Sequence, residues 1–371
     1  MVEIELKFQI SEARRTALLK ALDPKKSETI QLQAKYFDTP DRLLAQHGAA
    51  LRQRLEGISW IQTLKAAGKS HLHRFEHNHN LGELESSPEL DLSIYQAIPE
   101  AQQILTQALG SDAAALKLTF ETDIQRTYRV IQFEDAEIEV CLDVGVVRAS
   151  GREQTIHEVE FELKSGSVQS LLAFSFEWVK KYQLWLDVRS KAEMGNLLAL
   201  EQTVSPARFE KEFVLSKKES AAHNLSLLIG QQMQHLLPNI AAISAGVAEQ
   251  SHIDQAQTAL EHLQLTLALF KDWNSNISDK WAMQLAAFKH QFDHLQHLQH
   301  MQSTLGAFLQ NPTTTENLAK DILYAQEKLG NLVKSTQNVH HYLELLTFSL
   351  SSHDQVQKQD LKTYAHNTLQ N

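Results

Sequence analysis

The sequence predicts an α+β protein in which a strand-rich N-terminal part precedes an all-helical part. Over roughly the first two hundred residues, apolar and polar side chains alternate, which is the period of a strand with one buried face. From residue 208 onward, apolar residues recur at three- and four-residue spacing, which is typical of amphipathic helices. The segment Val204-Ser205-Pro206-Ala207 separates the two patterns, so we expect one domain over 1–204 and another over 208–371.

The alternating segments of the first part predict six strands, punctuated by glycines: 2–10, 50–56, 59–66, 71–79, 136–144 and 156–164. Two stretches there predict helices instead, 11–22 after the cap-like Ser11 and 167–182 after Gly166. In the second part we predict a bundle of helices. Its members are a run from Leu225 to Leu236 that Pro238 stops, then 251–272, 279–309 and, after Asn311-Pro312, 315–350.

Composition narrows the class of protein. The chain has 371 residues, enough for about two domains, with 43% hydrophobic and 22% charged residues. It has no run of about 18 apolar residues, and its acidic, alternating N-terminus does not resemble a secretory signal. A single cysteine, Cys141, fits a reducing compartment, so we expect a cytoplasmic protein without a membrane contact. The formal charge of -10 argues against nonspecific binding of nucleic acid.

Charged residues share one face of each predicted strand, because side chains two residues apart point the same way. Glu3, Glu5 and Lys7 share a face of the first strand. The same holds in the later strands for Arg52 with Arg54, Thr63 with Lys65, Arg74 with Glu76, Glu137 and Glu139 with Cys141 and Asp143, and Glu158, Glu160 and Glu162 with Lys164. For any one strand, a face exposed to water is the ordinary explanation of this pattern.

Together the strands favour a different arrangement, in which the sheet curls into a barrel with its charged face inward. Carboxylates that meet in such an interior repel each other by about 4 kcal/mol per pair at a distance of about 4 Å, and a divalent cation relieves this repulsion. Clustered arginines and lysines need an anion, and a polyphosphate supplies several charges with acceptors that match guanidinium groups. Both kinds of residue facing one interior therefore predict a site for a metal–polyphosphate complex.

Six motifs carry a family resemblance in chain order: Glu3-x-Glu5-x-Lys7, Tyr36-Phe37-Asp38-Thr39-Pro40, Leu51-Arg52-Gln53-Arg54, Leu64-Lys65, Glu158-x-Glu160-x-Glu162 and Ser190-Lys191. In this order they resemble the CYTH superfamily, also called triphosphate tunnel metalloenzymes, over roughly residues 1–200. The resemblance implies a closed antiparallel barrel of eight strands, a tunnel that binds a triphosphate, and dependence on Mg²⁺ or Mn²⁺.

The resemblance also implies roles for individual residues. The implied metal ligands are Glu3, Glu5, Glu158, Glu160, Glu162 and Asp143. The implied phosphate-binding residues are Lys7, Arg52, Arg54, Lys65, Arg126 and Lys191, and Glu5, Lys7, Arg54 and Lys65 are the candidates for catalysis. Glu76 is a candidate for orienting the basic groups, and Glu139 is a weaker one. Arg74 and Lys164 lie at strand margins, where a surface position is at least as good an interpretation.

The C-terminal half resembles a short CHAD domain, a helical and histidine-bearing module associated with polyphosphate. It holds twelve of the 18 histidines but only one arginine, Arg208, unlike the basic members of that family. His290, His294 and His297 follow one another at helical spacing on the side opposite to the apolar residues. This stripe is open to three interpretations: a solvated face, a transition-metal site, or a surface for phosphate or a protein partner.

The function expected from these features is metal-dependent hydrolysis of inorganic triphosphate to pyrophosphate and phosphate. Two alternatives stay open. One is a noncatalytic module that binds polyphosphate or nucleotide phosphates, in which the acidic strands serve only the fold. The other is a CYTH enzyme for a different triphosphate, such as a thiamine triphosphatase or an adenylate cyclase.

Overall fold

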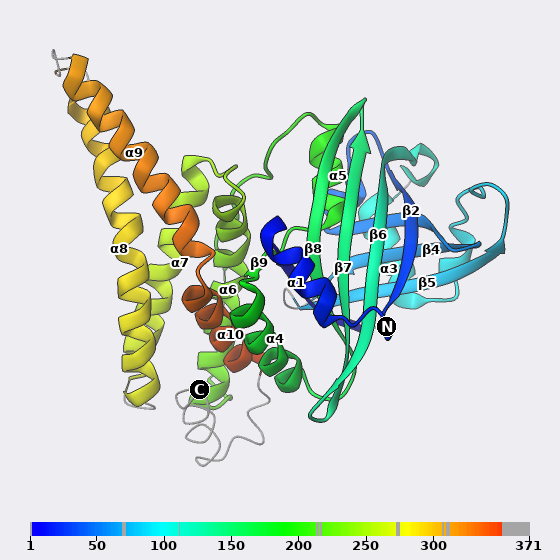
Figure 1. The fold of residues 1–371 in the computed structure, drawn as a ribbon, viewed down its shortest axis with the longest axis horizontal. Coiled ribbons are helices and arrows are strands. Elements are labelled where there is room, and N and C mark those ends of the chain that lie inside the picture. The colour runs from blue at the N-terminus through cyan, green and yellow to red at the C-terminus, as the bar shows by residue number, and fades with distance from the viewer. Residues whose placement is uncertain are drawn as a thin grey trace. The chain divides into compact units, whose positions relative to one another are not determined.

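The computed structural model describes residues 2–68, 72–110, 112–212, 215, 217–271, 275–305, 308 and 312–350. The chain forms two compact units, Met1–Ser205 and Pro206–Asn371. Figure 1 shows the strands in the first unit and a set of long helices in the second. None of the helices in the described ranges combines the length and the apolar character that crossing a membrane requires.

The strands of the first unit form one antiparallel sheet that closes on itself. In chain order they are β1 Val2–Gln9, β2 Glu28–Asp38, β3 Ala49–Glu56, β4 Ser59–Ala67, β5 His73–Glu83, β6 Lys117–Phe133, β7 Ala136–Ala149, β8 Arg152–Ser165 and β9 Trp185–Leu186. They lie in the order β5-β4-β3-β2-β6-β7-β8-β1-β9, and the start of β1 also pairs with β5. This last pairing closes the ring and leaves the two-residue β9 as an addition beside β1. The expected closed eight-stranded antiparallel barrel is therefore confirmed.

All six predicted strands are present, with shifted ends. The strands β2, β6 and β9 were not predicted. This unit also contains the helices α1 Glu12–Ala21, α2 Leu43–Gln46, α3 Pro99–Leu109, α4 Val168–Tyr182 and α5 Lys191–Ala199, and the 3₁₀ turns η1 Ser93–Tyr95 and η2 Asp112–Ala115. The helices α1 and α4 match the two predicted ones, and the other helices were not predicted.

Helix α4 covers apolar residues on the outer face of β1 and β8. The ring of Phe161 on β8 lies 5.1 Å from that of Phe8 on β1, and 5.3 Å and 5.6 Å from those of Phe174 and Trp178 on α4. Phe8 and Phe161 are completely buried. Because side chains alternate along a strand, this packing turns the charged neighbours of both phenylalanines toward the interior of the barrel.

A second apolar cluster covers the outer face of β3, β4 and β5, beneath α2, η1 and α3. Two buried glutamines next to it fasten the connection between β5 and η1. The side chain of Gln53 donates to Gln62 at 3.1 Å and to the carbonyl of Glu89 at 3.2 Å. Gln62 in turn accepts from the backbone N–H of Asp91 at 3.2 Å. These bonds satisfy polar groups that burial would otherwise leave without partners.

The barrel interior is apolar at the end that α5 covers. Ile124 on β6 lies opposite Leu32 on β2, two residues from Arg126 and on the same face, and it packs in a buried cluster with Ile156 and Met194. Helix α5 approaches closely because it carries a glycine. A Cβ atom on Gly195 would lie 2.1 Å from the ring of Phe120, so a larger residue would push the helix away.

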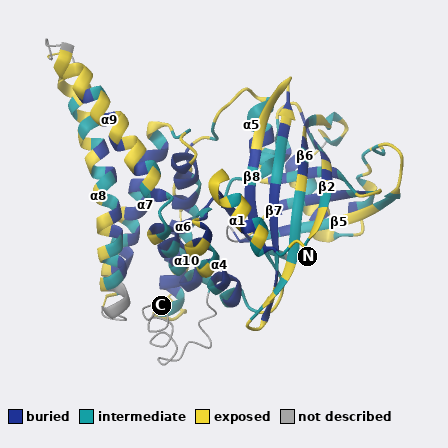
Figure 2. Cartoon of the chain, in the orientation of Figure 1, coloured by how far each residue is buried: buried dark blue, intermediate teal, exposed yellow. Residues whose placement is uncertain are grey.

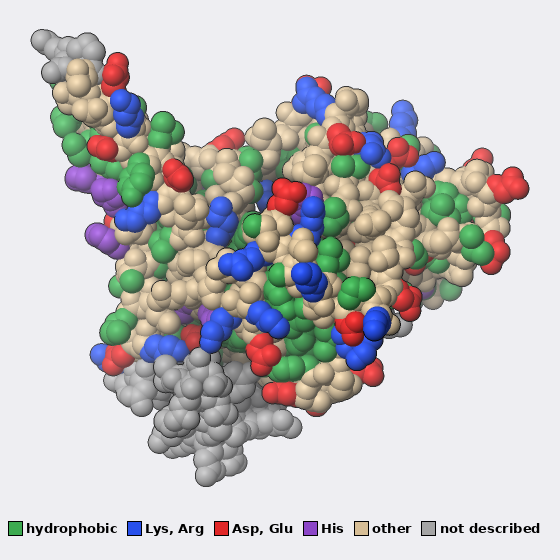
Figure 3. Space-filling model, in the orientation of Figure 1, with side chains coloured by type: hydrophobic (Ala, Val, Ile, Leu, Met, Phe, Trp, Pro, Cys, Tyr) green, Lys and Arg blue, Asp and Glu red, His purple; other side chains and the backbone are tan. Residues whose placement is uncertain are grey.

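The second unit consists of helices α6 Ala221–Ser244, α7 Gln250–Leu269, α8 Ser275–Leu305, α9 Pro312–Val333 and α10 Thr336–Leu350. Figure 2 shows that α6 is largely buried, whereas α8 and α9 carry long exposed faces. His290, His294 and His297 lie on the exposed side of α8, which confirms the expected polar stripe, and Figure 3 shows histidine side chains gathered over this helix. Leu285 and Phe292 on its opposite side are buried.

Two boundaries in this unit differ from the prediction. Pro238 does not stop the first helix, since α6 continues to Ser244. The neighbouring Asn239 stabilises this stretch, because its side-chain amide donates to the carbonyls of His235 and Arg208 at 2.8 Å and 2.9 Å. The predicted helix 315–350 is two helices, α9 and α10.

The break between α9 and α10 has a local cause. The hydroxyl of Ser335 caps α10 by accepting from the backbone N–H of Asn338 at 3.3 Å. The side chain of Asn338 donates to the carbonyl of Leu332 at 2.8 Å, which satisfies one of the last carbonyls of α9.

We predict that Gly195→Val loosens the covered end of the barrel, because its Cβ would meet the ring of Phe120. Overpacking of this kind costs about 1–3 kcal/mol. Hydrogen exchange followed by mass spectrometry should show faster exchange in α5 and the start of β6. The control is Gly330→Ala in α9, where the nearest atom is 3.7 Å from the added Cβ and exchange should be unchanged or slower. Equal protection of α5 in Gly195→Val and the parent protein would contradict this packing.

Candidate active site inside the barrel

The register of the ladders brings charged residues of neighbouring strands together on the interior face. Residues directly opposite one another in antiparallel strands share a face. Lys7 on β1 is opposite Glu160 on β8, and Glu158 on β8 is opposite Asp143 on β7. Asp143 is in turn opposite Arg126 on β6. Four strands, β1, β6, β7 and β8, therefore contribute to one charged region.

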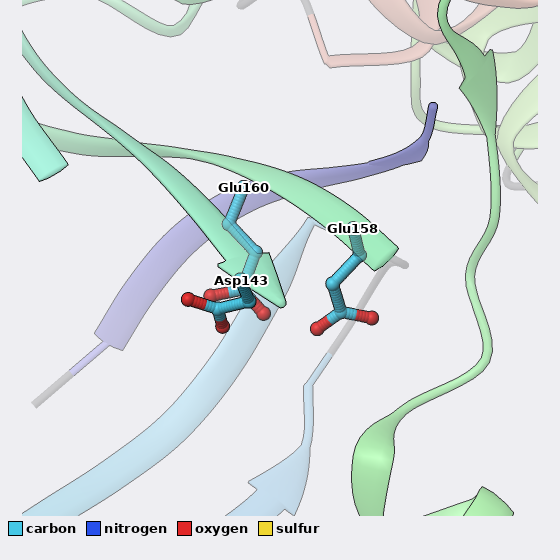
Figure 4. Close-up of side chains that lie close together, drawn as sticks. All are labelled: Asp143, Glu158 and Glu160. Atoms are coloured by element: carbon cyan, nitrogen blue, oxygen red, sulfur yellow. The ribbon is translucent and has the colours of Figure 1, made fainter. Parts of the chain in front are cut away.

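Three carboxylates of this region form a compact acidic cluster, defined by Asp143, Glu158 and Glu160. One oxygen of each lies within 4.8 Å of the others. Figure 4 shows the three carboxylates on the same side of the strands β7 and β8. All three side chains belong to buried residues. Carboxylates so close together and so far from water need positive charge nearby.

Cations of the chain itself neutralise the acidic cluster. The ammonium of Lys191, the first residue of α5, lies 2.8 Å from Asp143 Oδ2 and 2.9 Å from Glu160 Oε1, and it also contacts Glu158 Oε1. Arg126 donates two hydrogen bonds to Asp143, at 2.7 Å and 2.6 Å, and one to Glu160 Oε2 at 2.5 Å. Lys7 Nζ is more distant, 3.8 Å from Glu160 and 4.0 Å from Glu158.

Glu158 is the least compensated member of the acidic cluster. Its Oε2 is buried and has no hydrogen-bond partner in the described ranges. Burial raises the pKa of Glu158 to about 7, against the opposing attraction of Lys191 and Lys7. For Glu160, by contrast, Lys191 and Arg126 outweigh burial and hold the pKa well below its usual range.

The acidic cluster fits a hard divalent cation. Mg²⁺ and Mn²⁺ prefer carboxylate oxygens, and here one buried oxygen still lacks a partner while the neighbouring carboxylates are ionised. For Asp143, Arg126 and Lys191 outweigh burial and lower the pKa. These observations show a buried acidic cluster that could hold a divalent metal ion.

A second charged group surrounds Lys65 on β4. Its ammonium lies 2.8 Å from Glu3 Oε2 and 2.9 Å from Glu76 Oε2, and Arg52 Nη2 lies 3.8 Å from Glu76 Oε1. Burial raises the pKa of Glu3 to about 8, with Lys65 opposing it and the neighbouring carboxylates of Glu5 and Glu76 adding to it. Burial acts in the same direction on Glu76, but Lys65, the hydrogen bond with Glu3 and Arg52 prevail and lower its pKa. The pKa of Glu3 is thus raised while that of Glu76 is lowered.

Arg74 belongs to the interior, and its interpretation as a surface residue was wrong. Arg74 Nη1 lies 2.9 Å from Glu5 Oε1, and Arg74 is opposite Glu3 in the ladder between β1 and β5. Although burial opposes it, the Glu5 carboxylate raises the pKa of Arg74. The alternation along the strand already placed Arg74 on the same face as Glu76, and this could have indicated an interior position. The closure of β5 onto β1, which turns a strand margin into a wall of the barrel, is not visible in the sequence.

Lys164 does lie at a margin, with its side chain 36% exposed. It pairs with Glu162 at 2.9 Å and with Glu139 at 3.2 Å. Neither carboxylate is a member of the acidic cluster, and neither are Glu3 and Glu5. The roles of Glu3, Glu5 and Glu162 as metal ligands stay predictions.

Two arginines lie side by side on β3. The Nε of Arg54 donates to Glu56 Oε1 at 2.6 Å. Burial lowers the pKa of Arg54, and the like charge of Arg52 adds to this effect. Arg52 also lies opposite Tyr36 in the ladder with β2, and despite burial its charge lowers the pKa of the Tyr36 phenol. Two neighbouring guanidinium groups, with Glu56 close to Arg54 and Glu76 at 3.8 Å from Arg52, favour an anion.

We predict that the barrel without metal loses stability as pH rises from about 5 to about 8. The pKa of Glu3 is about 8 in the folded chain and 4.5 for the same carboxyl in water, so folding takes up a proton in this window. The stabilising contribution is complete below the unfolded value and is lost as pH passes the folded one. Glu158 acts in the same direction, so Glu3→Gln should reduce this loss without abolishing it.

The measurement is hydrogen exchange of peptides from β1 at several pH values, corrected for the intrinsic rate. The matched control is Glu12→Gln, at an exposed position of α1, which should leave the pH dependence unchanged. A Glu3→Gln protein with the same pH dependence as the parent would show that Glu3 is ionised throughout.

The chain is similar to several known proteins. The chain is 33% identical over 227 residues to the inorganic triphosphatase of Haemophilus influenzae, an alignment that covers 59% of this chain and 62% of that protein. The chain therefore matches somewhat less than two thirds of that relative's length.

Solved structures with similarity include a proposed adenylyl cyclase from Hippeastrum with a dominant triphosphatase activity, 17% identical, with a TM-score of 0.38 over 54% of this chain and 97% of that one. A conserved hypothetical protein from Pyrococcus furiosus is 17% identical, with a TM-score of 0.33 over 52% and 98% of the two chains. The model of the CYTH domain matches residues 1–194, more than half of the 371 residues. With its closed antiparallel barrel and charged interior, the chain thus belongs to the CYTH family.

Proposed function

We propose that the barrel hydrolyses inorganic triphosphate to pyrophosphate and phosphate with the help of Mg²⁺ or Mn²⁺. The observation that carries this proposal is the meeting of the acidic cluster with Arg126, Lys191 and Lys7 on one interior face. A substrate that fits such a site brings several negative charges together with a divalent cation. The activity of the Haemophilus influenzae relative supports the choice of inorganic triphosphate.

In this proposal, Asp143, Glu158 and Glu160 hold the metal ion. When bound, such a cation neutralises phosphate oxygens and acidifies a bound water. Besides their predicted role as metal ligands, Glu3 and Glu5 contact Lys65 and Arg74 and keep these cations in place. Glu162 does the same for Lys164 at the edge of the barrel.

The basic residues bind the phosphate chain. Arg126, Lys7 and Lys191 lie next to the acidic cluster, and Arg52, Arg54 and Lys65 continue the positive charge along β3 and β4. Guanidinium groups match phosphate oxygens in pairs of hydrogen bonds, and ammonium groups act as point charges. Hydrolysis then needs a water molecule in line with the leaving oxygen and charge stabilisation around the phosphorus, and no side-chain nucleophile.

The apolar end of the interior favours a short substrate. The cluster of Leu32, Ile124, Ile156 and Met194 fills the end beneath α5 with buried side chains. Apolar groups cannot replace the water around a phosphate, so a long polyphosphate chain gains nothing from extending there. Inorganic triphosphate, with only three phosphates, needs less of the interior than a long polyphosphate chain does.

We propose that residues 1–204 form the catalytic domain and that the helical part, 208–371, is an accessory domain in a cytoplasmic protein. A contact with a protein or with polyphosphate is the role we propose for this second part, and we expect no nucleic acid or membrane as a partner. Its exposed histidine stripe on α8 is the surface best suited to such a contact.

The test of the proposed activity is a substrate panel. We expect phosphate release from tripolyphosphate in Mg²⁺ or Mn²⁺, with lower rates for ATP and thiamine triphosphate. Chelation by EDTA should stop turnover, and added metal should restore it. Binding of tripolyphosphate without turnover would establish the noncatalytic alternative, and cyclic AMP from ATP or a preference for thiamine triphosphate would establish a different enzyme of the family.

We predict that Glu160→Gln lowers the rate with tripolyphosphate by a factor of about 100 or more, the range typical for the loss of a charge-stabilising group in an active site. The measurement is steady-state release of phosphate with saturating metal. The matched control is Glu137→Gln on β7, which changes an exposed carboxylate of the same barrel and should leave the rate unchanged. Comparable rates for the two variants would place the site elsewhere.

A further inference from the structure

Lys191 has an unusual position among the cations of the barrel. Its Nζ contacts one oxygen of each member of the acidic cluster: Asp143 Oδ2 at 2.8 Å, Glu160 Oε1 at 2.9 Å, and Glu158 Oε1. Among the described residues, no other cation contacts all three carboxylates. The ammonium thus lies among the oxygens with which the acidic cluster would bind a metal.

The other two cations of this region lie differently. Arg126 binds Asp143 Oδ1 and Glu160 Oε2, which are not the oxygens that Lys191 contacts, in addition to Asp143 Oδ2. Lys7 stays 3.8 Å or more from the acidic cluster and donates to the carbonyl of Arg189 at 3.4 Å. Arg126 can therefore keep most of its hydrogen bonds when a metal ion binds, and Lys191 cannot.

A divalent cation and the ammonium compete for the same space. Mg²⁺ binds oxygen ligands at about 2.0–2.1 Å, and an ammonium less than 3 Å from the same oxygens would lie almost in contact with it. Two like charges at such a distance repel strongly in a buried site. We infer that Lys191 is an internal counter-ion that the metal ion must displace, and that the displaced ammonium then binds the phosphate chain.

The backbone of Lys191 is held in place, so the side chain alone can make this movement. Ser190 caps α5 by accepting from the N–H of Glu193 at 3.0 Å. Just before it, the guanidinium of Arg189 donates two hydrogen bonds to the carboxylate of Asp187, from Nε to Oδ1 at 3.0 Å and from Nη2 to Oδ2 at 2.6 Å. A lysine side chain has four flexible carbons, which let its ammonium change partner while the helix stays where it is.

The inference has two parts. The displacement of Lys191 by the metal ion does not depend on the proposed function, whereas the binding of the displaced ammonium to the phosphate chain rests on it. Binding of the metal breaks the ion pairs of Lys191 with the acidic cluster. The freed ammonium is then available to bind phosphate. Each ligand should therefore strengthen the binding of the other, and by the same factor. Without Lys191 the metal should bind more tightly alone, and the coupling between metal and phosphate should shrink.

The first experiment measures binding of Mn²⁺ alone by electron paramagnetic resonance. We expect Lys191→Met to bind Mn²⁺ about tenfold more tightly or better, which corresponds to about 1.4 kcal/mol. The control is Lys164→Met, which removes a positive charge that pairs with Glu139 and Glu162 instead of the acidic cluster, and here we expect a change of less than about threefold. Unchanged or weaker Mn²⁺ binding by Lys191→Met would overturn the inference.

A second measurement uses the unaltered protein and does not depend on the folding of a variant. Mn²⁺ should make the Lys191 amine react several times faster with a small acylating reagent, read by mass spectrometry of the peptide, because its carboxylate partners are taken. An unchanged rate at saturating Mn²⁺ would show that the ammonium stays in place, against the inference.

The third measurement concerns the coupling. Mn²⁺ should tighten binding of a methylene-bridged triphosphate analogue to the unaltered protein, and Lys191→Met should lose most of this gain. Equal coupling in both proteins would refute the transfer of Lys191 to phosphate. Failure of the first two measurements alongside normal hydrolysis would overturn the inference and leave the proposed function intact. If the first two measurements succeed but the protein does not hydrolyse tripolyphosphate, the displacement of Lys191 stands and the proposed function is overturned.

Discussion

Mutual compensation of buried charges is the constraint on which the rest of the barrel depends. A buried carboxylate without a partner is very costly, and removing one partner of a buried pair leaves that cost uncompensated. The interior therefore alternates in sign: Lys191 and Arg126 face Glu160, Lys65 faces Glu3, and Arg74 faces Glu5. Compensation is least complete at Glu158, whose Oε2 has no hydrogen-bond partner among the described residues, and at Glu3, whose pKa burial raises to about 8.

The same constraint shapes the outside of the barrel. Because the strands turn their charges inward, their apolar residues point outward and need a cover. Helix α4 supplies aromatic rings over β1 and β8, and α3 packs over β3, β4 and β5. Helix α5 instead covers one end, where Gly195 permits close contact with Phe120. Since α5 begins at Lys191, the packing that covers this end also positions a cation among the three carboxylates.

An interior with balanced charges is prepared for an exchange of partners. In the proposed function, a metal ion would take carboxylates from lysine and a polyphosphate would take arginines and lysines from carboxylates, so that no isolated charge would remain when both bind. This explains in physical terms why one face combines acidic and basic residues in place of a purely basic anion site.

The sequence by itself determined the local structure: alternation predicted β1, β3, β4, β5, β7 and β8, helical spacing predicted the bundle, and ordered motifs named most charged residues of the interior. It missed β2 and β6, since β6 is partly exposed on both faces over its second half and so lacks a clear alternation. The sequence also predicted that Pro238 ends the helix. The helix α6 continues past it, because hydrogen bonds of the Asn239 side chain support the chain there. Only the tertiary structure decided that Arg74 faces inward and that Asp143, Glu158 and Glu160 form the compact cluster. Those facts depend on closure and on register between distant strands, which no local pattern encodes.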